Sequence, residues 1–170
     1  MQRDQVQTQL TYFTSISVDE ENATRQRELF NANKLLNGDK FELVYGQYYP
    51  LNIKCSNCQY ITHKHVEKRT DVNIAIKMIE DCYENRVDVI SLVSADSDLI
   101  PSIELIQKIF PNILIRVYFP PSNYSYHFYK KIRKGKDMLI QLEKNFPNFI
   151  KSKMPDIVTD GVKSYTIPEK

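Results

Sequence analysis

Two carboxylates, Asp96 and Asp98, stand two positions apart directly after the mainly apolar run of residues 87–93. Alternate side chains of an extended segment point the same way, so the two carboxylates converge if strand geometry persists through Ala95. Adjacent carboxylates resist joint ionisation, and a hard divalent cation such as Mg²⁺ or Mn²⁺ neutralises them. This spacing therefore predicts a metal site. The alternative is structural, because Asp and Ser are favourable caps for the helix expected from about Leu99.

The segments around this motif alternate between strand-like and helix-like patterns, which is typical of an α/β fold with a mainly parallel sheet flanked by helices. We expect strands at residues 10–17, 41–49, 87–93 and 113–119, helices at residues 23–36, 71–85 and 99–110, and an irregular or hairpin-like excursion at residues 51–69. The apolar run of residues 113–119 is typical of a parallel strand that is buried on both faces. Asn37 and Gly38 are expected to end the first helix in a left-handed turn.

Helical spacing predicts which residues of two helices face the core. The predicted buried positions are Val72, Ala75, Ile76, Ile79, Cys82 and Tyr83 in the helix of residues 71–85, and Ile103, Ile106 and Ile109 in the helix of residues 99–110. The carboxyl ends of parallel strands and the starts of the following helices share one edge of a sheet. Asp71, at the start of the first of these helices, is therefore expected to approach Asp96 and Asp98, so that three carboxylates line one cleft.

Length, charge and composition exclude several classes of protein. A chain of 170 residues fits one domain, and no stretch approaches the run of about 18 apolar residues that spans a membrane. No amino-terminal segment has the basic start and apolar region of a secretory signal. The net charge of +2 is small, and three cysteines, an odd number, indicate a reducing compartment. We therefore predict a cytoplasmic protein with no membrane partner. The four glycines form no phosphate-cradling loop, which argues against phosphoryl transfer from a nucleotide.

The order of two acidic motifs carries a family resemblance. The motif EKRTDVNIA at residues 67–75 precedes the motif VSADSDLIP at residues 93–101. In both sequence and order, these motifs resemble the NYN domain family of PIN-like nucleases. Further matches are Tyr12, Phe13 and Thr14, the stretch of residues 25–27, the strand end at residues 44–46, the pair Cys55 and Cys58, and residues 154–156. The resemblance covers most of the chain.

The resemblance implies a three-layer, Rossmann-like α/β fold and a metal-dependent endoribonuclease that hydrolyses RNA phosphodiester bonds. A bound cation stabilises the charge that develops on a phosphodiester oxygen and lowers the pKa of an attacking water. By this resemblance Asp71, Asp96 and Asp98 hold Mg²⁺ or Mn²⁺ and are catalytic. Residues expected to contact the RNA or a metal-bound water are Ser94, Asn73 and Lys68; their alternative roles are a turn closure for Ser94, a helix start for Asn73 and a solvated surface for Lys68.

The chain also departs from the family pattern. NYN domains open with a hydrophobic strand that ends in an Asp followed shortly by an Asn, whereas residues 1–9 are polar and nothing before Leu10 can form that strand. We therefore expect residues 1–170 to be a single, amino-terminally incomplete domain that lacks the first strand. Either the sequence is a fragment or it is a degenerate member whose gap is filled otherwise. The alternative function is a noncatalytic RNA-binding or protein-interaction module with the same fold.

A second metal site is suggested by Cys55 and Cys58, followed by His63 and His65. Two thiolates and two imidazoles suffice for tetrahedral Zn²⁺, so structural zinc is one hypothesis. The spacing of the two histidines is not that of a standard zinc finger, and a second pair of cysteines is missing. Free thiols in a reducing compartment are the alternative.

The carboxyl-terminal segment of residues 121–170 is expected to be basic and helical. Its basic residues include Lys130, Lys131 and Arg133, and the aromatic residues Tyr124, Tyr126, Phe128 and Tyr129 lie beside them. Positive charge attracts phosphates and aromatic rings stack on bases, so this pattern predicts binding of single-stranded RNA. The alternative is a solvated lysine-rich surface whose aromatic neighbours belong to the core. The sequence leaves the oligomeric state open.

Overall fold

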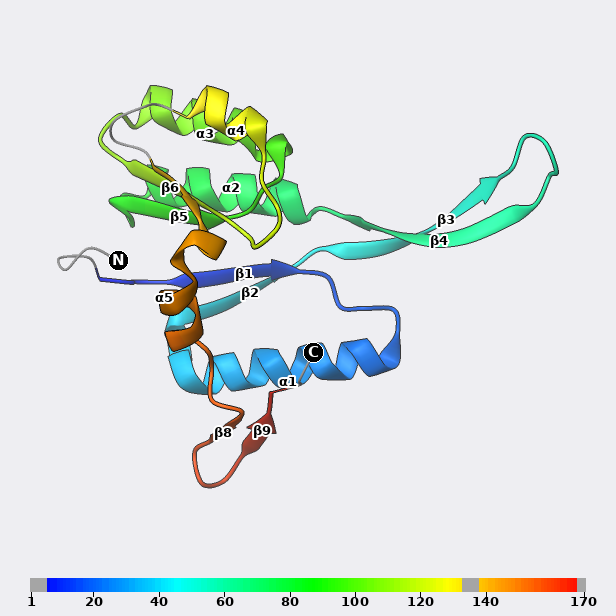
Figure 1. Ribbon diagram of the computed structural model, residues 1–170, viewed down its shortest axis with the longest axis horizontal. Helices are drawn as coiled ribbons and strands as arrows, with labels where there is room; N and C mark the ends of the chain where they lie inside the picture. Colours follow the sequence, from blue (N-terminus) through cyan, green and yellow to red (C-terminus); the bar gives the residue numbers. More distant parts are fainter. Residues whose placement is uncertain (1–5, 133–137, 168–170) are drawn as a thin grey trace. The chain divides into compact units, whose positions relative to one another are not determined.

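The computed structural model describes residues 6–132 and 138–167, and it shows a mixed α/β chain (Figure 1). The chain divides into two compact units. The first contains Met1–Asn73 and Met154–Lys170, and the second contains Ile74–Lys153. In the described part of the chain, no helix is both long enough and apolar enough to pass through a membrane.

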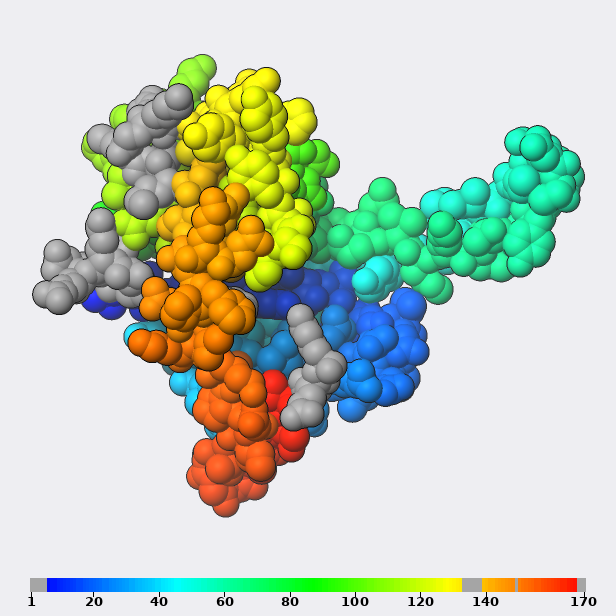
Figure 2. All heavy atoms as spheres, in the orientation of Figure 1, coloured from blue at the N-terminus to red at the C-terminus, as the bar shows by residue number. Residues whose placement is uncertain are grey.

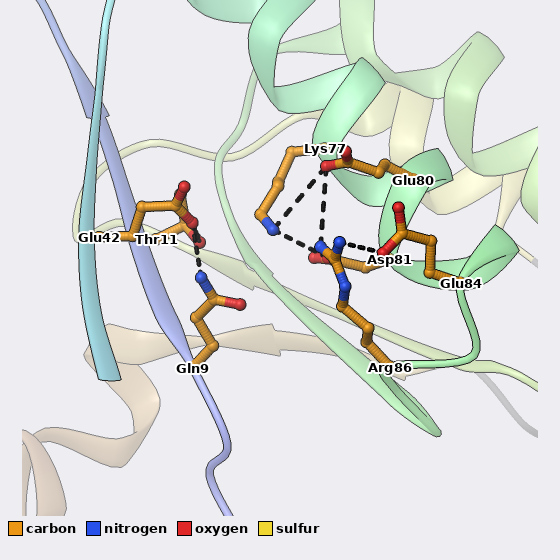
Figure 3. Close-up of polar contacts among 8 residues, drawn as sticks. All are labelled: Gln9, Thr11, Glu42, Lys77, Glu80, Asp81, Glu84 and Arg86. Atoms are coloured by element: carbon orange, nitrogen blue, oxygen red, sulfur yellow. Dashed lines mark hydrogen bonds and ion pairs between the residues drawn. The ribbon is translucent and has the colours of Figure 1, made fainter. Parts of the chain in front are cut away.

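The first unit is built on two parallel strands joined by a helix. Strand β1 (Leu10–Thr14) pairs with β2 (Phe41–Tyr45), and α1 (Glu20–Asn37) connects them. Side-chain hydrogen bonds also link the two strands. Gln9 Nε2, just before β1, and Thr11 Oγ1, within β1, donate to Glu42 Oε2 of β2 over 2.5 and 3.2 Å (Figure 3). The expected strand at residues 10–17 is therefore confirmed as far as residue 14.

Helix α1 ends as the sequence predicts, but it begins at Glu20, three residues before the expected start at residue 23. The Asp19 carboxylate accepts a hydrogen bond of 2.9 Å from the Asn22 backbone N–H, and Gly38 follows the helix with a φ of 54°. A 3₁₀ turn, η1 (Gly38–Lys40), leads from there to β2. The helix packs against a short antiparallel hairpin of β8 (Ile157–Thr159) and β9 (Ser164–Thr166). The buried residues of the first unit are Ala23, Phe30, Ala32, Phe41, Val158 and Ser15.

A long antiparallel hairpin follows Gly46. Strand β3 (Gln47–Lys54) pairs with β4 (Ile61–Lys68) along its whole length, which confirms the hairpin-like excursion and places its start before residue 51. The single strand expected at residues 41–49 is instead divided at Gly46 between two sheets. Within the first unit the hairpin extends away from the β1–β2 pair and from α1, as the cyan and green ribbon in Figure 1 shows.

The second unit holds a three-stranded parallel sheet in the order β5-β6-β7. Its strands are β5 (Val89–Val93), β6 (Leu114–Phe119) and β7 (Met138–Gln141). The central strand, β6, is almost wholly buried, as its continuous apolar run predicts, and Arg116 is buried there with its apolar neighbours. A 3₁₀ turn, η3 (Leu142–Asn145), and a short helix, α5 (Phe146–Lys151), complete the unit.

Three helices accompany this sheet. Helix α2 (Thr70–Tyr83) begins in the first unit and continues into the second, α3 (Ile100–Ile109) follows β5, and α4 (Tyr126–Lys131) follows β6 and packs against α3 (Figure 1). The buried core of the second unit comprises Met78, Cys82, Leu92, Leu99, Ile103, Ile106, Ile115, Val117, Phe119, Phe128 and Ile132. This burial confirms the predicted inward positions Cys82, Ile103 and Ile106.

Several predicted core positions are wrong. Val72, Ile76 and Tyr83 are 61%, 59% and 78% exposed, while Ile74 and Met78 pack in or against the core in their place. Ile79 packs against the core as predicted. The first turns of α2 carry apolar residues on nearly all sides, so helical spacing alone does not single out the buried face. Ile109 is 54% exposed because it is the last residue of α3.

An ion network closes the far end of α2. Lys77 Nζ lies 2.9 Å from Asp81 Oδ1, and Arg86 Nη1 lies 3.1 Å from the same oxygen (Figure 3). Arg86 also pairs with Glu80 and Glu84. The network joins the last turns of the helix to the loop that enters β5.

The carboxyl-terminal residues 121–170, expected to be helical, contain strands β7, β8 and β9 as well as α4 and α5.

Candidate functional site

The loop between β5 and α3 positions the first two candidate carboxylates. Ser94 N–H donates to the Tyr118 carbonyl over 3.1 Å, and Asp96 N–H donates to Ser94 Oγ over 3.0 Å. Asp98 N–H in turn donates to Asp96 Oδ1 over 2.9 Å, which makes Asp96 the N-cap of the 3₁₀ turn η2 (Ser97–Leu99). The structural roles predicted for Asp96 as a cap and Ser94 as a turn closure are therefore confirmed.

The prediction that strand geometry persists through Ala95 is wrong. Strand β5 ends at Val93, and Asp98 lies in a 3₁₀ turn. The two acidic residues remain neighbours because the backbone of Asp98 binds the side chain of Asp96. Both are exposed at the carboxyl end of a parallel strand, which is where open α/β sheets bind their ligands.

The donor set formed by Asp96 and Asp98 suits a hard cation. An ionised carboxylate offers about four lone-pair sites, so the cap bond leaves acceptor capacity on Asp96. Mg²⁺ usually keeps several waters and is held by only one or two carboxylates, which this pair supplies. Within the described residues, no group of three or more His, Cys, Asp and Glu side chains is placed to hold a metal ion.

Asp71 lies in the first turn of α2 and is exposed. It belongs to the first unit, whereas Asp96 and Asp98 belong to the second. Its convergence with those two residues therefore stays a prediction.

A polar cluster that sequence reasoning missed supports the start of α2. Glu67 Oε1 accepts hydrogen bonds from Ser15 Oγ over 3.1 Å and from Thr70 Oγ1. All three side chains surround Gly46, where an added Cβ atom would lie 2.3 to 2.5 Å from their oxygens. Glycine is therefore required at position 46 to let the cluster form. The sequence offered little signal for it, because Ser15 and Glu67 are 52 positions apart.

The backbone just before Asp71 is conformationally unusual. Arg69 has a φ of 80°, in the left-handed region that non-glycine residues seldom adopt. Its guanidinium donates to the Tyr49 hydroxyl over 2.8 Å and lies 5.8 Å from the centre of that ring. These two contacts on the hairpin hold the strained residue. Such strain is often found beside functional sites.

Asn73 and Lys68 lie near the same helix start. Asn73 Nδ2 donates to the Tyr45 carbonyl over 3.3 Å, so its side chain ties α2 to the end of β2. Lys68 is exposed at the end of β4, opposite Gln47. Contact of these two residues with RNA stays a prediction.

The four residues predicted to bind zinc within one chain are not brought together as a metal-binding group. Cys55 and Cys58 are exposed in the turn of the β3–β4 hairpin. His63 lies farther along β4, where its Nδ1 is 2.7 Å from Asn52 Oδ1, and His65 is opposite Pro50.

The basic aromatic segment is partly surface and partly core. Tyr124, Tyr126 and Tyr129 are 47%, 60% and 56% exposed, whereas Phe128 is fully buried with its ring 5.8 Å from that of Phe119. The core alternative is therefore confirmed for Phe128 and is wrong for Tyr126 and Tyr129. Tyr124 is half-exposed, and its ring lies 5.0 Å from that of the buried Phe119. Lys130 Nζ lies 4.9 Å from the centre of the Tyr126 ring, and Lys131 pairs with Glu104 over 3.1 Å. Arg133 lies outside the described residues.

The cap bond of Asp96 gives a first prediction. Replacement of Asp96 by Ala removes the acceptor for Asp98 N–H, so the free energy of unfolding is expected to fall by about 1 kcal/mol. Asp96→Asn keeps a capping oxygen and is expected to stay close to wild type. Urea denaturation followed by circular dichroism measures both, with Asp88→Ala as a control for loss of an exposed carboxylate at the other end of β5. Equal stability of the Ala and Asn variants would contradict the cap.

Comparison with known proteins identifies one family. The family model described as "NYN domain" matches residues 14–110, which is more than half of the chain and includes Asp71, Asp96 and Asp98. Neither a curated protein nor a solved structure matches the chain significantly.

Proposed function

Because this chain belongs to the NYN domain family, whose PIN-like fold is that of nucleases, we propose that it is a metal-dependent ribonuclease that hydrolyses RNA phosphodiester bonds. The observation that carries the proposal is the exposed pair Asp96 and Asp98 at the carboxyl end of β5. The matched family segment contains this pair together with Asp71.

In this proposal Asp96 and Asp98 hold Mg²⁺ or Mn²⁺, and Asp71 joins them directly or through water. When bound, the cation supplies charge stabilisation at a phosphodiester oxygen and lowers the pKa of the attacking water. The hydrogen bonds among Ser94, Asp96 and Asp98 fix the loop that presents the carboxylates, so little rearrangement is required when a cation binds.

The RNA is proposed to be single-stranded and to contact α4. The exposed rings of Tyr126 and Tyr129 offer stacking surfaces, and Lys130 adds positive charge beside one of them. Lys131 contributes less in this proposal because Glu104 already neutralises it. Support comes from the combination of exposed aromatic rings and basic side chains on one short helix.

The activity is tested with the full chain, labelled single-stranded RNA and Mn²⁺ or Mg²⁺. The expected result is cleavage that requires the added cation and stops when EDTA removes it. A folded protein that binds RNA without cleaving it in either cation would instead support the second candidate, a noncatalytic RNA-binding module. The exposed tyrosines of α4 are the observation that favours this candidate.

RNA binding gives a second prediction. Tyr126→Ala is expected to weaken binding of single-stranded RNA by about 1 kcal/mol or more, because one base loses its stacking partner. Lys130→Ala is expected to reduce the slope of log K against log salt by about 0.7, the effect of losing one phosphate contact. Fluorescence anisotropy over a series of salt concentrations measures both. The control is Tyr83→Ala, which removes a tyrosine of α2 that is 78% exposed, compared with 60% for Tyr126. Equal affinities for Tyr126→Ala and Tyr83→Ala would argue against α4 as the RNA-binding surface.

A further inference from the structure

The turn that joins β3 and β4 carries two exposed cysteines, Cys55 and Cys58, three positions apart. Backbone hydrogen bonds close it, from Cys55 N–H to the Tyr60 carbonyl over 2.8 Å and from Gln59 N–H to the Cys55 carbonyl over 3.0 Å. Gln59 has a φ of 60°, in the left-handed region, which turns the chain back immediately after Cys58. The turn therefore holds the two cysteine side chains close to each other.

The side chains of Cys55 and Cys58 are within hydrogen-bonding distance of each other. The Cys55 sulfur accepts hydrogen bonds from the backbone N–H groups of Cys58 and Asn57 and from the side chain of Cys58, and these bonds lower the pKa of the Cys55 thiol. Cys82 differs, because burial and the charge of Asp81 raise its pKa to about 11.

Two sulfurs fill only half of a tetrahedral zinc site. His63 is engaged with Asn52, and the described residues contain no group of three His, Cys, Asp or Glu side chains that includes the two cysteines. A structural zinc site is closed by four protein ligands, and within the described residues the two cysteines lack the other two.

The surface of the hairpin indicates where those two ligands come from. Tyr49, Leu51 and Ile53 alternate along β3, so they share one face, and each is at least 40% exposed. Across the hairpin, Thr62 and Val66 lie opposite Ile53 and Tyr49 and so share this face, as does Lys64 opposite Leu51. The space-filling view shows the hairpin as a narrow arm with its tip clear of the other atoms of the first unit (Figure 2). An exposed apolar stripe of this kind marks an interaction surface.

We propose that two copies of this chain join at the tips of their β3–β4 hairpins, where Cys55 and Cys58 of both copies share one Zn²⁺. A second copy brings two further sulfurs and an identical apolar stripe, so one symmetric contact completes the coordination and covers exposed apolar side chains. Each of the four thiols loses its proton when its sulfur binds Zn²⁺, so assembly of one dimer releases four protons. The inference is independent of the nuclease proposal.

The test uses the full chain purified under reducing conditions and loaded with Zn²⁺. Elemental analysis is expected to find about one zinc per two chains, the ratio at which each ion takes four sulfurs, and light scattering after size exclusion is expected to give the mass of a dimer. Chelation should return the monomer, and added zinc should restore the dimer. Cys55→Ser should lose both zinc and dimer. His63→Ala is the matched control and should keep both.

Replacement of Zn²⁺ by Co²⁺ provides a second, spectroscopic test of which residues bind the metal. Tetrahedral coordination by thiolates is expected to give a strong sulfur-to-cobalt absorption band in the wild type and in His63→Ala, and no such band in Cys55→Ser. One zinc per chain that is lost in His63→Ala would overturn the proposal in favour of a single-chain site. Absence of zinc uptake, or a dimer that persists in Cys55→Ser, would overturn it as well.

Discussion

Replacement of Asp96 by Asn is expected to lower the rate of Mn²⁺-dependent RNA cleavage by at least about 100-fold, the scale of losing one group that stabilises transition-state charge. The amide is neutral and is a weaker ligand for a hard cation, yet Asn still caps the turn that leads into α3. Folding is therefore expected to persist while cleavage is lost. Initial rates on labelled single-stranded RNA, at saturating Mn²⁺, measure the effect.

Asp88→Asn is the matched control, because Asp88 is an exposed carboxylate beside the opposite end of β5. It is expected to cleave at the wild-type rate, whereas Asp98→Asn is expected to show a loss comparable to that of Asp96→Asn. The same rate in wild type and Asp96→Asn would contradict the proposed role of the carboxylate pair, and it would point to a contaminating nuclease.

The second large effect is on stability. Phe128→Ala is expected to lower the free energy of unfolding by about 3 to 5 kcal/mol, because it removes a fully buried aromatic ring and leaves a cavity against Phe119. This ring fixes α4 to the sheet, so the variant should also weaken RNA binding. Urea denaturation followed by circular dichroism gives the stability change.

Tyr129→Ala separates packing from binding, since Tyr129 is the next residue along α4 and is 56% exposed. Its stability is expected to stay within about 0.5 kcal/mol of wild type, as for most surface substitutions, while its affinity for single-stranded RNA falls. A large loss of stability in Tyr129→Ala, or none in Phe128→Ala, would contradict the division of this segment into core and surface.

The elements that the sequence predicted well are those with one dominant local signal. The continuous apolar run before Pro120 predicted the buried strand β6, and the pair Asn37 and Gly38 predicted the end of α1. In both places the local preference agrees with the tertiary environment, so a short window of sequence was sufficient.

The details that failed depend on contacts between distant parts of the chain. The buried face of α2 runs through Ile74 and Met78 rather than Val72 and Ile76, because the sheet of the second unit selects among several apolar positions. The cluster of Ser15, Glu67 and Thr70 around Gly46 likewise joins segments that are remote in sequence, so no local pattern indicates it.

For the candidate site, residue types were more informative than assumed geometry. Asp96 and Asp98 are neighbours as expected, but a side-chain cap joins them after β5 has ended, which alternation along a strand does not describe. Cys55 and Cys58 share the turn of the hairpin as free cysteines. The predicted group of four zinc ligands is not formed among the described residues, because His63 and His65 lie along β4, away from the turn.

The central claim is that the acidic residues of the family motifs together bind a divalent cation, and titration of the full chain with Mn²⁺, followed by electron paramagnetic resonance, tests it most directly. Wild type and Asp88→Asn are expected to bind Mn²⁺ alike. Asp96→Asn, Asp98→Asn and Asp71→Asn are each expected to weaken binding by at least about 10-fold, the smallest cost usual for disturbing a metal site. Titration curves for these three variants that superimpose on the wild-type curve would contradict the claim.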